Sequence, residues 1–223
     1  QPAAFNCLPL IDLPAAQYDS NQLLAMGRGA DDSLTTPTHP NHLIATFHPR
    51  GRRARSLLAL MIRDSLTGLF NHTHTLHLLD QEIVRARQKE QPLCFAMIDI
   101  DYFKKVNDTF GHPIGDRVLR SLSMFLKQRL RKTDHIGRYG GEEFAIILPD
   151  TADPGVIAES CRKGVLERAM PHELSSVAEY VTISLGLTTT GVATEVTPEG
   201  LVDRADSALY EAKESGRNRV CVG

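Results

Sequence analysis

An unbroken apolar segment, LCFAMI at Leu93–Ile98, runs directly into Asp99, Ile100 and Asp101. Strands that are buried on both faces have such continuous apolar runs, whereas half-exposed strands alternate apolar and polar residues. We therefore expect Leu93–Ile98 to form a central strand of a sheet that helices cover. The carboxyl groups of Asp99 and Asp101 would then lie at the exposed edge where this strand ends.

The residues around this strand alternate between helical and strand patterns from about Asp64 to the last residue. Apolar residues recur every three or four positions in the predicted helices, and the predicted strands are short apolar runs. The predicted helices are Thr75–Arg87, Ile114–Leu130, Pro154–Arg168 and Pro198–Ser215, and the other predicted strands are Ile136–Tyr139, Glu142–Leu148, Tyr180–Leu187 and Arg219–Val222. This order predicts an α/β (α+β) fold with helices on a central mixed sheet. Gly140 and Gly141 would supply the positive φ angles of a tight hairpin turn.

The composition is that of a folded protein, since 42% of the 223 residues are hydrophobic and 23% are charged. Disorder along the whole length is therefore excluded. The sequence has no run of about 18 apolar residues, so we expect no membrane-spanning helix. The formal net charge of −2 argues against a broad surface for a nucleic acid polymer. The four cysteines lack a metal or redox spacing, and no secretory signal is visible, so we expect a cytoplasmic location.

The first 63 residues differ from the rest, because they contain no Lys or Glu and hold six of the twelve prolines. We expect two short strands here, at Leu8–Leu13 and Leu34–Thr36, each followed by a helix. The segments GADDSLTTP and HPNHLIATFHPRGRRAR resemble the last third of a two-component receiver domain. That family usually has Lys before the Pro, where this chain has Thr36, and the strands that would carry the phosphorylated Asp are missing.

This resemblance divides the chain into a partial receiver-like segment at 1–55, a linker helix at 56–63 and a main domain at 64–223. Such a remnant would not work as a phosphorylation switch. The alternative for the first segment is an irregular leader that ends in a basic linker.

Four carboxylates could meet in space, since Asp99 and Asp101 end the central strand and Glu142 and Glu143 follow the Gly-Gly turn. Carboxylates that are held close together repel one another unless a cation or a proton lies between them. Mg²⁺ suits such a site because it prefers oxygen and shares its shell between one or two carboxylates and substrate phosphates. From these residues alone, the alternative is that the acids only solvate the strand ends.

Five ordered motifs resemble those of the GGDEF family of diguanylate cyclases over about residues 64–223. They are DSLTGLFN at Asp64–Asn71, IDIDYFKKVNDTFGHPIGD at Ile98–Asp116, RKTD at Arg131–Asp134, GGEEF at Gly140–Phe144 and AKESGRN at Ala212–Asn218. In this family they are, in turn, the opening motif, the metal and nucleotide segment, the inhibitory RxxD site, the signature and the closing element. The resemblance implies a nucleotidyl-cyclase-like fold whose mixed sheet is mainly antiparallel and flanked by helices.

The resemblance also implies roles for individual residues. The metal ligands would be Asp99, the backbone carbonyl of Ile100, Glu142 and Glu143. Glu142 and Glu143 would also be the catalytic residues. The ions would be two Mg²⁺ or Mn²⁺. The residues that bind substrate would be Phe103, Lys104, Asn107, His112, Asp116, Lys213 and Arg217. A carboxylate and an amide suit the donors and acceptors of guanine, which Asp116 and Asn107 would read. Lys213 and Arg217 would share one face of a helix end and grip the terminal phosphates.

The implied reaction is the condensation of two GTP molecules into cyclic di-GMP with loss of pyrophosphate. Each domain would bind one GTP, so the resemblance implies a homodimer. Arg131 and Asp134, with Arg162 from a facing subunit, would form a site at which the product inhibits the enzyme.

Several alternatives remain open. A cyclase-like domain could bind GTP or cyclic di-GMP and signal without turnover, or the chain could be a scaffold in a two-component pathway. Taken alone, Asn107 and Asp116 could be helix caps, Lys213 and Arg217 a solvated helix face, and Arg131 and Asp134 a surface ion pair.

Three closely spaced histidines, His72, His74 and His77, could bind zinc. No Cys or fourth ligand is nearby, and the segment begins a helix, so we do not expect a zinc site. His72 stands where the GGDEF family usually has Arg, and we expect it to be structural.

Overall fold

The computed structural model describes residues 11–12, 32–33, 41, 45, 52, 61–191 and 196–223. The chain divides into two compact units, Gln1–Ile62 and Arg63–Gly223. In the first unit, β1 (Ile11–Asp12) pairs in parallel with β2 (Asp32–Ser33). β1 lies inside the first expected strand and β2 ends just before the second. Most of the receiver-like segment lies outside the described residues.

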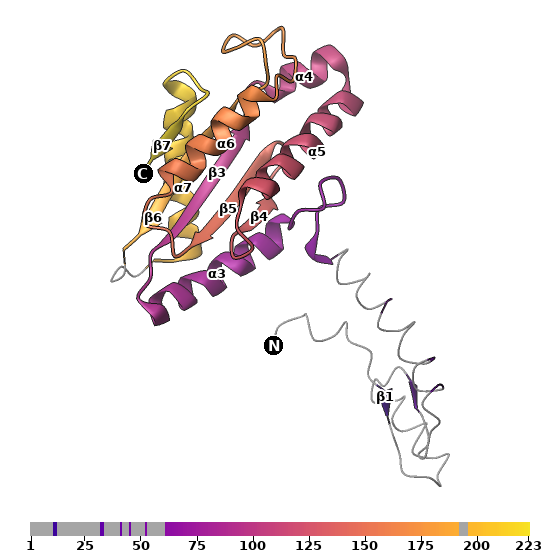
Figure 1. Ribbon diagram of the computed structural model, residues 1–223, viewed down its shortest axis with the longest axis vertical. Coiled ribbons are helices and arrows are strands. Elements are labelled where there is room, and N and C mark those ends of the chain that lie inside the picture. Colours follow the sequence, from indigo (N-terminus) through magenta and orange to yellow (C-terminus); the bar gives the residue numbers. More distant parts are fainter. Residues whose placement is uncertain are drawn as a thin grey trace. The chain divides into compact units, whose positions relative to one another are not determined.

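The second unit is built on a five-stranded sheet in the order β4-β5-β3-β6-β7 (Figure 1). The strands are β3 (Leu93–Ile100), β4 (His135–Arg138), β5 (Glu143–Pro149), β6 (Ile183–Thr190) and β7 (Val220–Val222). β3 pairs antiparallel with β5 and β6, β4 pairs antiparallel with β5, and only the β6–β7 pair is parallel within this sheet. Every residue of β3 is buried. The prediction of a mixed, mainly antiparallel sheet around a buried central strand is therefore confirmed.

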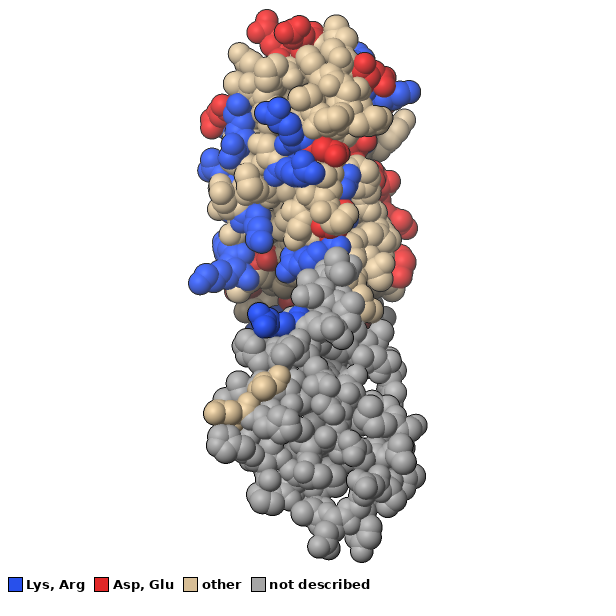
Figure 2. All heavy atoms as spheres, turned by 90° about the vertical axis from the view of Figure 1, so that its right-hand side faces the viewer, with Lys and Arg blue, Asp and Glu red and all other residues tan. Residues whose placement is uncertain are grey.

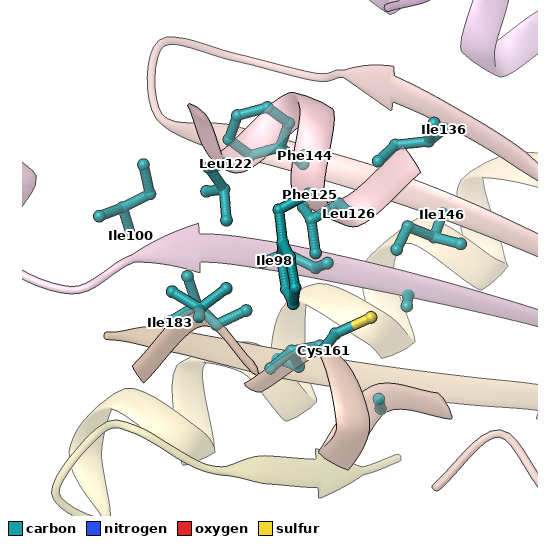
Figure 3. Close-up of a cluster of buried hydrophobic side chains, with 14 of the residues drawn as sticks. Ile98, Ile100, Leu122, Phe125, Leu126, Ile136, Phe144, Ile146, Cys161 and Ile183 are labelled. Carbon is teal, nitrogen blue, oxygen red and sulfur yellow. The ribbon is translucent and has the colours of Figure 1, made fainter. Parts of the chain in front are cut away.

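Helices cover both faces of this sheet (Figure 1). They are α3 (His72–Lys89), α4 (Phe103–Phe110), α5 (His112–Arg129), α6 (Gly155–Glu167) and α7 (Pro198–Glu214). Phe125 of α5 and Cys161 of α6 pack with Ile98 in one core cluster (Figure 3). Leu79 of α3 and Leu209 of α7 belong to a second cluster. None of the helices in the described residues is long and apolar enough to span a membrane.

The alternation of side chains along β3 decides which face each residue serves. The even-numbered residues from Cys94 to Ile100 belong to the core with α5 and α6, whereas Leu93, Phe95 and Met97 belong to the core with α3 and α7. Because both faces are covered, both sets are apolar, and this explains the unbroken run. The same alternation directs Asp99 to the face that α7 covers.

One helix was not predicted from the sequence. α4 lies between β3 and α5, and only two of its eight residues, Phe103 and Val106, are buried. A pattern of two buried positions is too short to reveal a helix by periodicity. The other four helices of this unit lie where they were expected, within three residues at either end.

Two details of the strands correct the sequence predictions. β6 begins at Ile183 rather than Tyr180, because Tyr180 instead forms an isolated bridge with Pro171. Gly140 and Gly141 are not among the described residues with positive φ angles, so the prediction for the hairpin turn was wrong. The connection runs over four residues, and the Tyr139 amide closes it by donating to the carbonyl of Glu143 at 2.8 Å. A connection of this length does not need the two-residue turn.

Candidate active site

The last turn of α7 brings an ammonium group onto the end of β3. Asp99 is 7% exposed, and its Oδ2 lies 2.9 Å from the Nζ of Lys213. In the sheet register Asp99 stands opposite Glu143 of β5 and Ser184 of β6. Asp99 is therefore a buried group, and not the exposed rim acid that the sequence predicted.

The acidic residues on this side of the sheet act on one another. Burial raises the pKa of Asp99 to about 6, and the charges of Glu142 and Glu143 add to the rise, whereas Lys213 opposes it. Burial also raises the pKa of Glu142, again with a contribution from Glu143 and against the effect of Lys213. These carboxylates are close enough to repel one another, as the sequence analysis expected.

The signature turn that carries Glu142 is fixed to the start of the domain. Arg138 donates to the carbonyl of Gly141 through Nε at 3.1 Å and Nη2 at 2.7 Å. Its Nη1 reaches Oδ2 of Asp64 at 3.2 Å. Asp64 also accepts from the amide and hydroxyl of Thr67, at 2.8 and 2.7 Å. The opening motif therefore holds the turn on which Glu142 lies.

These residues suit a cation that shares its coordination shell with a substrate. Among the described residues, no three His, Cys, Asp or Glu side chains converge to hold an ion unaided. Asp99, Glu142 and the carbonyl of Ile100 offer only oxygen, and burial, followed by the charges of Glu142 and Glu143, raises the pKa of Asp99 despite its contact with Lys213. Mg²⁺ binds in this way, through one or two carboxylates completed by phosphate oxygens and water. The donor set therefore fits Mg²⁺ or Mn²⁺.

The corner between α4 and α5 gathers the residues predicted to bind the base. Gly111, with φ of 79°, joins the two helices, and no side chain caps α5. A Cβ atom on Gly115 would collide with the amide oxygen of Asn107, so the Asn107 side chain lies against the first turns of α5. Asp116 is the next residue on that helix and is half-buried. Neither Asn107 nor Asp116 is an N-cap of a described helix.

The other predicted substrate residues of this corner differ in exposure. Phe103 is 4% exposed and belongs to the core, so that only its backbone is available to a ligand. Lys104 and His112 are exposed. The corner therefore presents polar side chains around the buried side chain of Phe103.

Lys213 and Arg217 do not share a helix face, because α7 ends at Glu214 with Ser215 as its C-cap. Arg217 lies beyond the helix with φ of 64°. Its Nη1 donates to the carbonyl of Lys213 at 3.2 Å, and its guanidinium lies 4.4 Å from the centroid of the Tyr102 ring. The turn after the helix, rather than the helix itself, thus brings the Arg217 guanidinium to the backbone of Lys213.

A buried hydrogen-bond network centred on Asp101 was not predicted from the sequence. Asp101 is 1% exposed. It accepts from the hydroxyls of Thr182 at 2.6 Å and Ser184 at 2.7 Å, and from the amide of Asn218 at 3.1 Å. Asp101 therefore supports the fold of the site and is not a rim acid. The hydroxyl residues of the TIS sequence, in which Thr182 directly precedes β6, were the available signal.

The RKTD segment forms a tight turn before β4. Oδ2 of Asp134 accepts from the Arg131 amide at 2.8 Å, and the Asp134 amide donates to the Arg131 carbonyl at 3.2 Å. The Arg131 side chain is exposed, whereas Oδ1 of Asp134 is buried without a hydrogen-bond partner. The Asp134 side chain thus contacts the backbone of Arg131, and the two side chains do not form the surface ion pair that was given as the alternative.

Arg162 on α6 is engaged elsewhere. It binds Glu159 at 2.7 and 3.0 Å and donates to Oδ1 of Asn218 at 2.7 Å. Within the described residues, Arg162 contacts neither Arg131 nor Asp134, so the structure does not bring these three predicted residues together. Their shared site would require a second subunit, as the sequence analysis supposed.

The three histidines contact aromatic groups. The His72 ring lies 4.4 Å from that of Tyr139, and the His74 ring lies 4.8 Å from that of Phe70 and 6.0 Å from that of His77. The amide of His74 donates to Asn71, which caps α3. The three histidines therefore pack against other rings in the first two turns of α3.

Residues 61–219 match the model of the family described as "Diguanylate cyclase, GGDEF domain". The chain belongs to the GGDEF family. The matched range contains every residue predicted for the active site, and it begins at the boundary between the two units.

Curated relatives extend this comparison. The response regulator PleD of Caulobacter vibrioides is 39% identical over 227 residues, which cover 96% of this chain and 49% of that protein. Diguanylate cyclase A of Treponema denticola is 38% identical over 158 residues, which cover 70% of this chain and 40% of that protein. The chain therefore spans less than half of the length of these relatives.

Solved structures of GGDEF proteins are similar in fold. The coiled coil and GGDEF domain of DgcB from Caulobacter crescentus, in complex with c-di-GMP, matches with a TM-score of 0.70 and 30% identity, over 82% of this chain and 98% of that one. The diguanylate cyclase SiaD of Pseudomonas aeruginosa, in complex with its activator SiaC, matches with a TM-score of 0.65 and 34% identity, over 92% and 81%. The predicted GGDEF fold is confirmed.

Proposed function

We propose that the chain is a diguanylate cyclase, which condenses two GTP molecules into one cyclic di-GMP and two pyrophosphates. The observation that carries the proposal is the convergence of Asp99, Glu142, Glu143 and Lys213 at the end of the central strand. This cluster joins acids suited to metal ions with a cation suited to phosphate. Family membership and relatives named as diguanylate cyclases support it.

The acids would hold the metal ions. Asp99, the Ile100 carbonyl and Glu142 would be the ligands, and Glu143 would assist at the metals or phosphates. When bound, such ions neutralise charge on the phosphates and lower the pKa of an attacking hydroxyl. Glu142 lies on a turn held by Arg138, and its carboxylate would receive the proton of the 3′-hydroxyl or hold the metal ion that acidifies it.

The α4–α5 corner would bind guanine. The Asp116 carboxylate would accept from the N1–H and N2–H₂ groups of the base, and the Asn107 amide would meet its acceptors. The closeness of the Asn107 amide to Gly115, which directly precedes Asp116, supports this assignment. The exposed Lys104 and His112 would lie at its edge.

Lys213 and Arg217 would bind the terminal phosphates. Lys213 would exchange its contact with Asp99 for phosphate oxygens, while the planar guanidinium of Arg217 would bind two oxygens at once. Each domain would present one α-phosphate and one 3′-hydroxyl, so the reaction requires two domains to face each other. We therefore propose that the active form is a homodimer.

The RxxD turn would bind the product. Oδ1 of Asp134 is a buried acceptor without a partner, which suits an N–H donor of guanine, and the exposed Arg131 could fork onto a phosphate. In Figure 2, Lys and Arg side chains gather toward the left of the domain. This side corresponds to the front of Figure 1, where α5 lies. The exposed Arg117, Arg120 and Lys127 of α5 would add to the attraction of an anion.

The first unit would be a receiver remnant. The relative that covers 96% of this chain is named a response regulator, which supports the resemblance of GADDSLTTP to a receiver domain. Thr36 stands where that family has Lys, and we expect no change in rate on addition of an acyl phosphate. A rate change would show that the first unit is still a phosphorylation switch.

One assay separates this proposal from a binding module without turnover. The chain is incubated with GTP and Mg²⁺ and the nucleotides are resolved by chromatography. We expect cyclic di-GMP from the wild-type chain and none from Glu142→Gln. A chain that binds GTP and leaves it unchanged would be a non-catalytic module.

A further inference from the structure

The turn after α7 has an unfavourable backbone conformation. Gly216, Arg217 and Asn218 have φ angles of 112°, 64° and 46°. Each of the last two carries a Cβ atom, which disfavours the left-handed conformation, although Asn adopts it more readily than Arg. Two in succession persist only where the surroundings hold them.

Asn218 is held from two sides. Oδ2 of Asp101 accepts from its backbone amide at 3.1 Å, and Nη1 of Arg162 donates to its side-chain oxygen at 2.7 Å. Asp101 is itself fixed, because Thr182 and Ser184 of the β6 region donate to both of its oxygens at 2.6 and 2.7 Å. Arg162 is tied to Glu159 on its own helix.

These contacts decide where the Arg217 side chain lies. Arg217 directly precedes Asn218, and its guanidinium lies over the ring of Tyr102, which directly follows Asp101. Tyr102 also has a positive φ angle, of 54°. Asp101 therefore holds the turn that carries the guanidinium, and the next residue in the chain supplies the ring beneath that guanidinium.

We infer that Asp101 and Arg162 are positioning residues that clamp Asn218 and so hold the Arg217 guanidinium ready for the terminal phosphates of the nucleotide. The inference rests on the proposed function, because it takes Arg217 as a phosphate ligand. Arg162 then has a role within its own subunit, besides the product site assigned to it above. A ligand that draws Arg162 away from Asn218 would loosen the phosphate-binding turn.

The first test needs no nucleotide. Backbone hydrogen exchange of the amides of Arg217 and Asn218 is measured in the wild-type chain, in Arg162→Ala and in Lys163→Ala. Lys163 is the neighbouring cation on α6 and is exposed, so its removal is a matched change of charge. We expect faster exchange at Asn218 in Arg162→Ala alone. Equal protection in all three proteins would overturn the clamp.

The second test concerns the phosphates. The affinities of 3′-deoxy-GTP, which lacks the attacking hydroxyl, and of the corresponding monophosphate are measured with Mg²⁺ present. Loss of a hydrogen bond of this kind should weaken triphosphate binding about threefold to tenfold in Arg162→Ala. The monophosphate should bind as before, because it lacks the terminal phosphates. Equal weakening of both nucleotides would indicate a general structural role and overturn the positioning role.

The third test uses two substitutions of Asn218, which distinguish the contact of its side chain with Arg162 from the conformation of its backbone. Asn218→Asp keeps an oxygen for Arg162 and tolerates the left-handed conformation, so it should retain triphosphate affinity, whereas Asn218→Ala should not. Loss in both variants would contradict the clamp. If the wild-type chain binds no triphosphate while Asn218 loses protection in Arg162→Ala, the proposed function fails and the clamp stands as a structural one.

Discussion

The Nζ atom of Lys213 lies 2.9 Å from Oδ2 of Asp99, so a cation of the chain itself contacts the carboxylate that we propose as a metal ligand. The two groups come from the last turn of α7 and the end of β3. A metal ion bound by Asp99 would therefore compete with Lys213 for this oxygen. Nucleotide phosphates would relieve that competition by attracting Lys213.

The competition predicts opposite effects in Lys213→Ala. Mn²⁺ should bind this variant more tightly than the wild-type chain when no nucleotide is present, because the competing ammonium has been removed. GTP should bind more weakly, because a phosphate contact is lost. Titration calorimetry measures both, with Lys89→Ala in the exposed last turn of α3 as the control. Weaker Mn²⁺ binding in Lys213→Ala would contradict the competition.

Asp99 should lower the stability of the metal-free chain at neutral pH. Its pKa in the folded chain is about 6, against an ordinary value of 3.8. The folded state thus holds the proton more tightly, and stability falls as the pH rises from about 4 to about 6. Asp99→Asn removes this penalty and should raise the free energy of unfolding at pH 7 by on the order of 1–3 kcal/mol.

This gain should be absent below about pH 4, where Asp99 is protonated in both states. Thermal unfolding of both proteins across this pH range, in the presence of a chelator, provides the measurement. The same variant should have no cyclase activity. A destabilised Asp99→Asn at pH 7 would show that the Lys213 contact outweighs the burial of the charge.

Asp116 should decide the choice of base. Asp116→Ala should weaken GTP binding by about 1–3 kcal/mol, because the guanine donors lose their acceptor. Binding of ATP should change little, so discrimination between the two nucleotides falls. Asp108→Ala removes an exposed acid of α4 near the same corner and is the matched control. Unchanged GTP affinity in Asp116→Ala would show that Asp116 is structural.

Arg131 should carry the response to product. Cyclic di-GMP should inhibit the wild-type chain without competing for the GTP pocket, and Arg131→Ala should relieve this inhibition while basal turnover stays the same. Inhibition curves are compared at fixed GTP, with Lys132→Ala as the neighbouring control. Superimposable curves for wild type and Arg131→Ala would remove the assignment of the RxxD turn.

Long apolar patterns made much of the fold predictable from the sequence. β3 is buried on both faces and α5 buries one face, and each leaves a periodic trace over many residues. α4 leaves no such trace because only Phe103 and Val106 are buried on it. Gly140 and Gly141 suggested a tight turn, but the longer connection that Arg138 holds does not need one.

The site residues that stand in short motifs could be predicted from the sequence. The contacts between residues that lie far apart in the sequence could not. Asp99 and Glu142 stand in recognisable segments, and they do lie close together. The link from Arg162 to Asn218 spans 56 residues and depends on left-handed backbone at residues other than Gly. No periodicity signals such a contact, so only the structure shows it.

The central claim is that two GTP molecules are joined, and the most direct measurement is the balance of nucleotides in one reaction. The purified chain is incubated with GTP and Mg²⁺, and GTP, cyclic di-GMP, GDP and pyrophosphate are quantified together over time. We predict one cyclic di-GMP and two pyrophosphates for every two GTP consumed, and no consumption in Glu142→Gln although it still binds GTP. GTP that stays intact, or that yields GDP instead, would contradict the account.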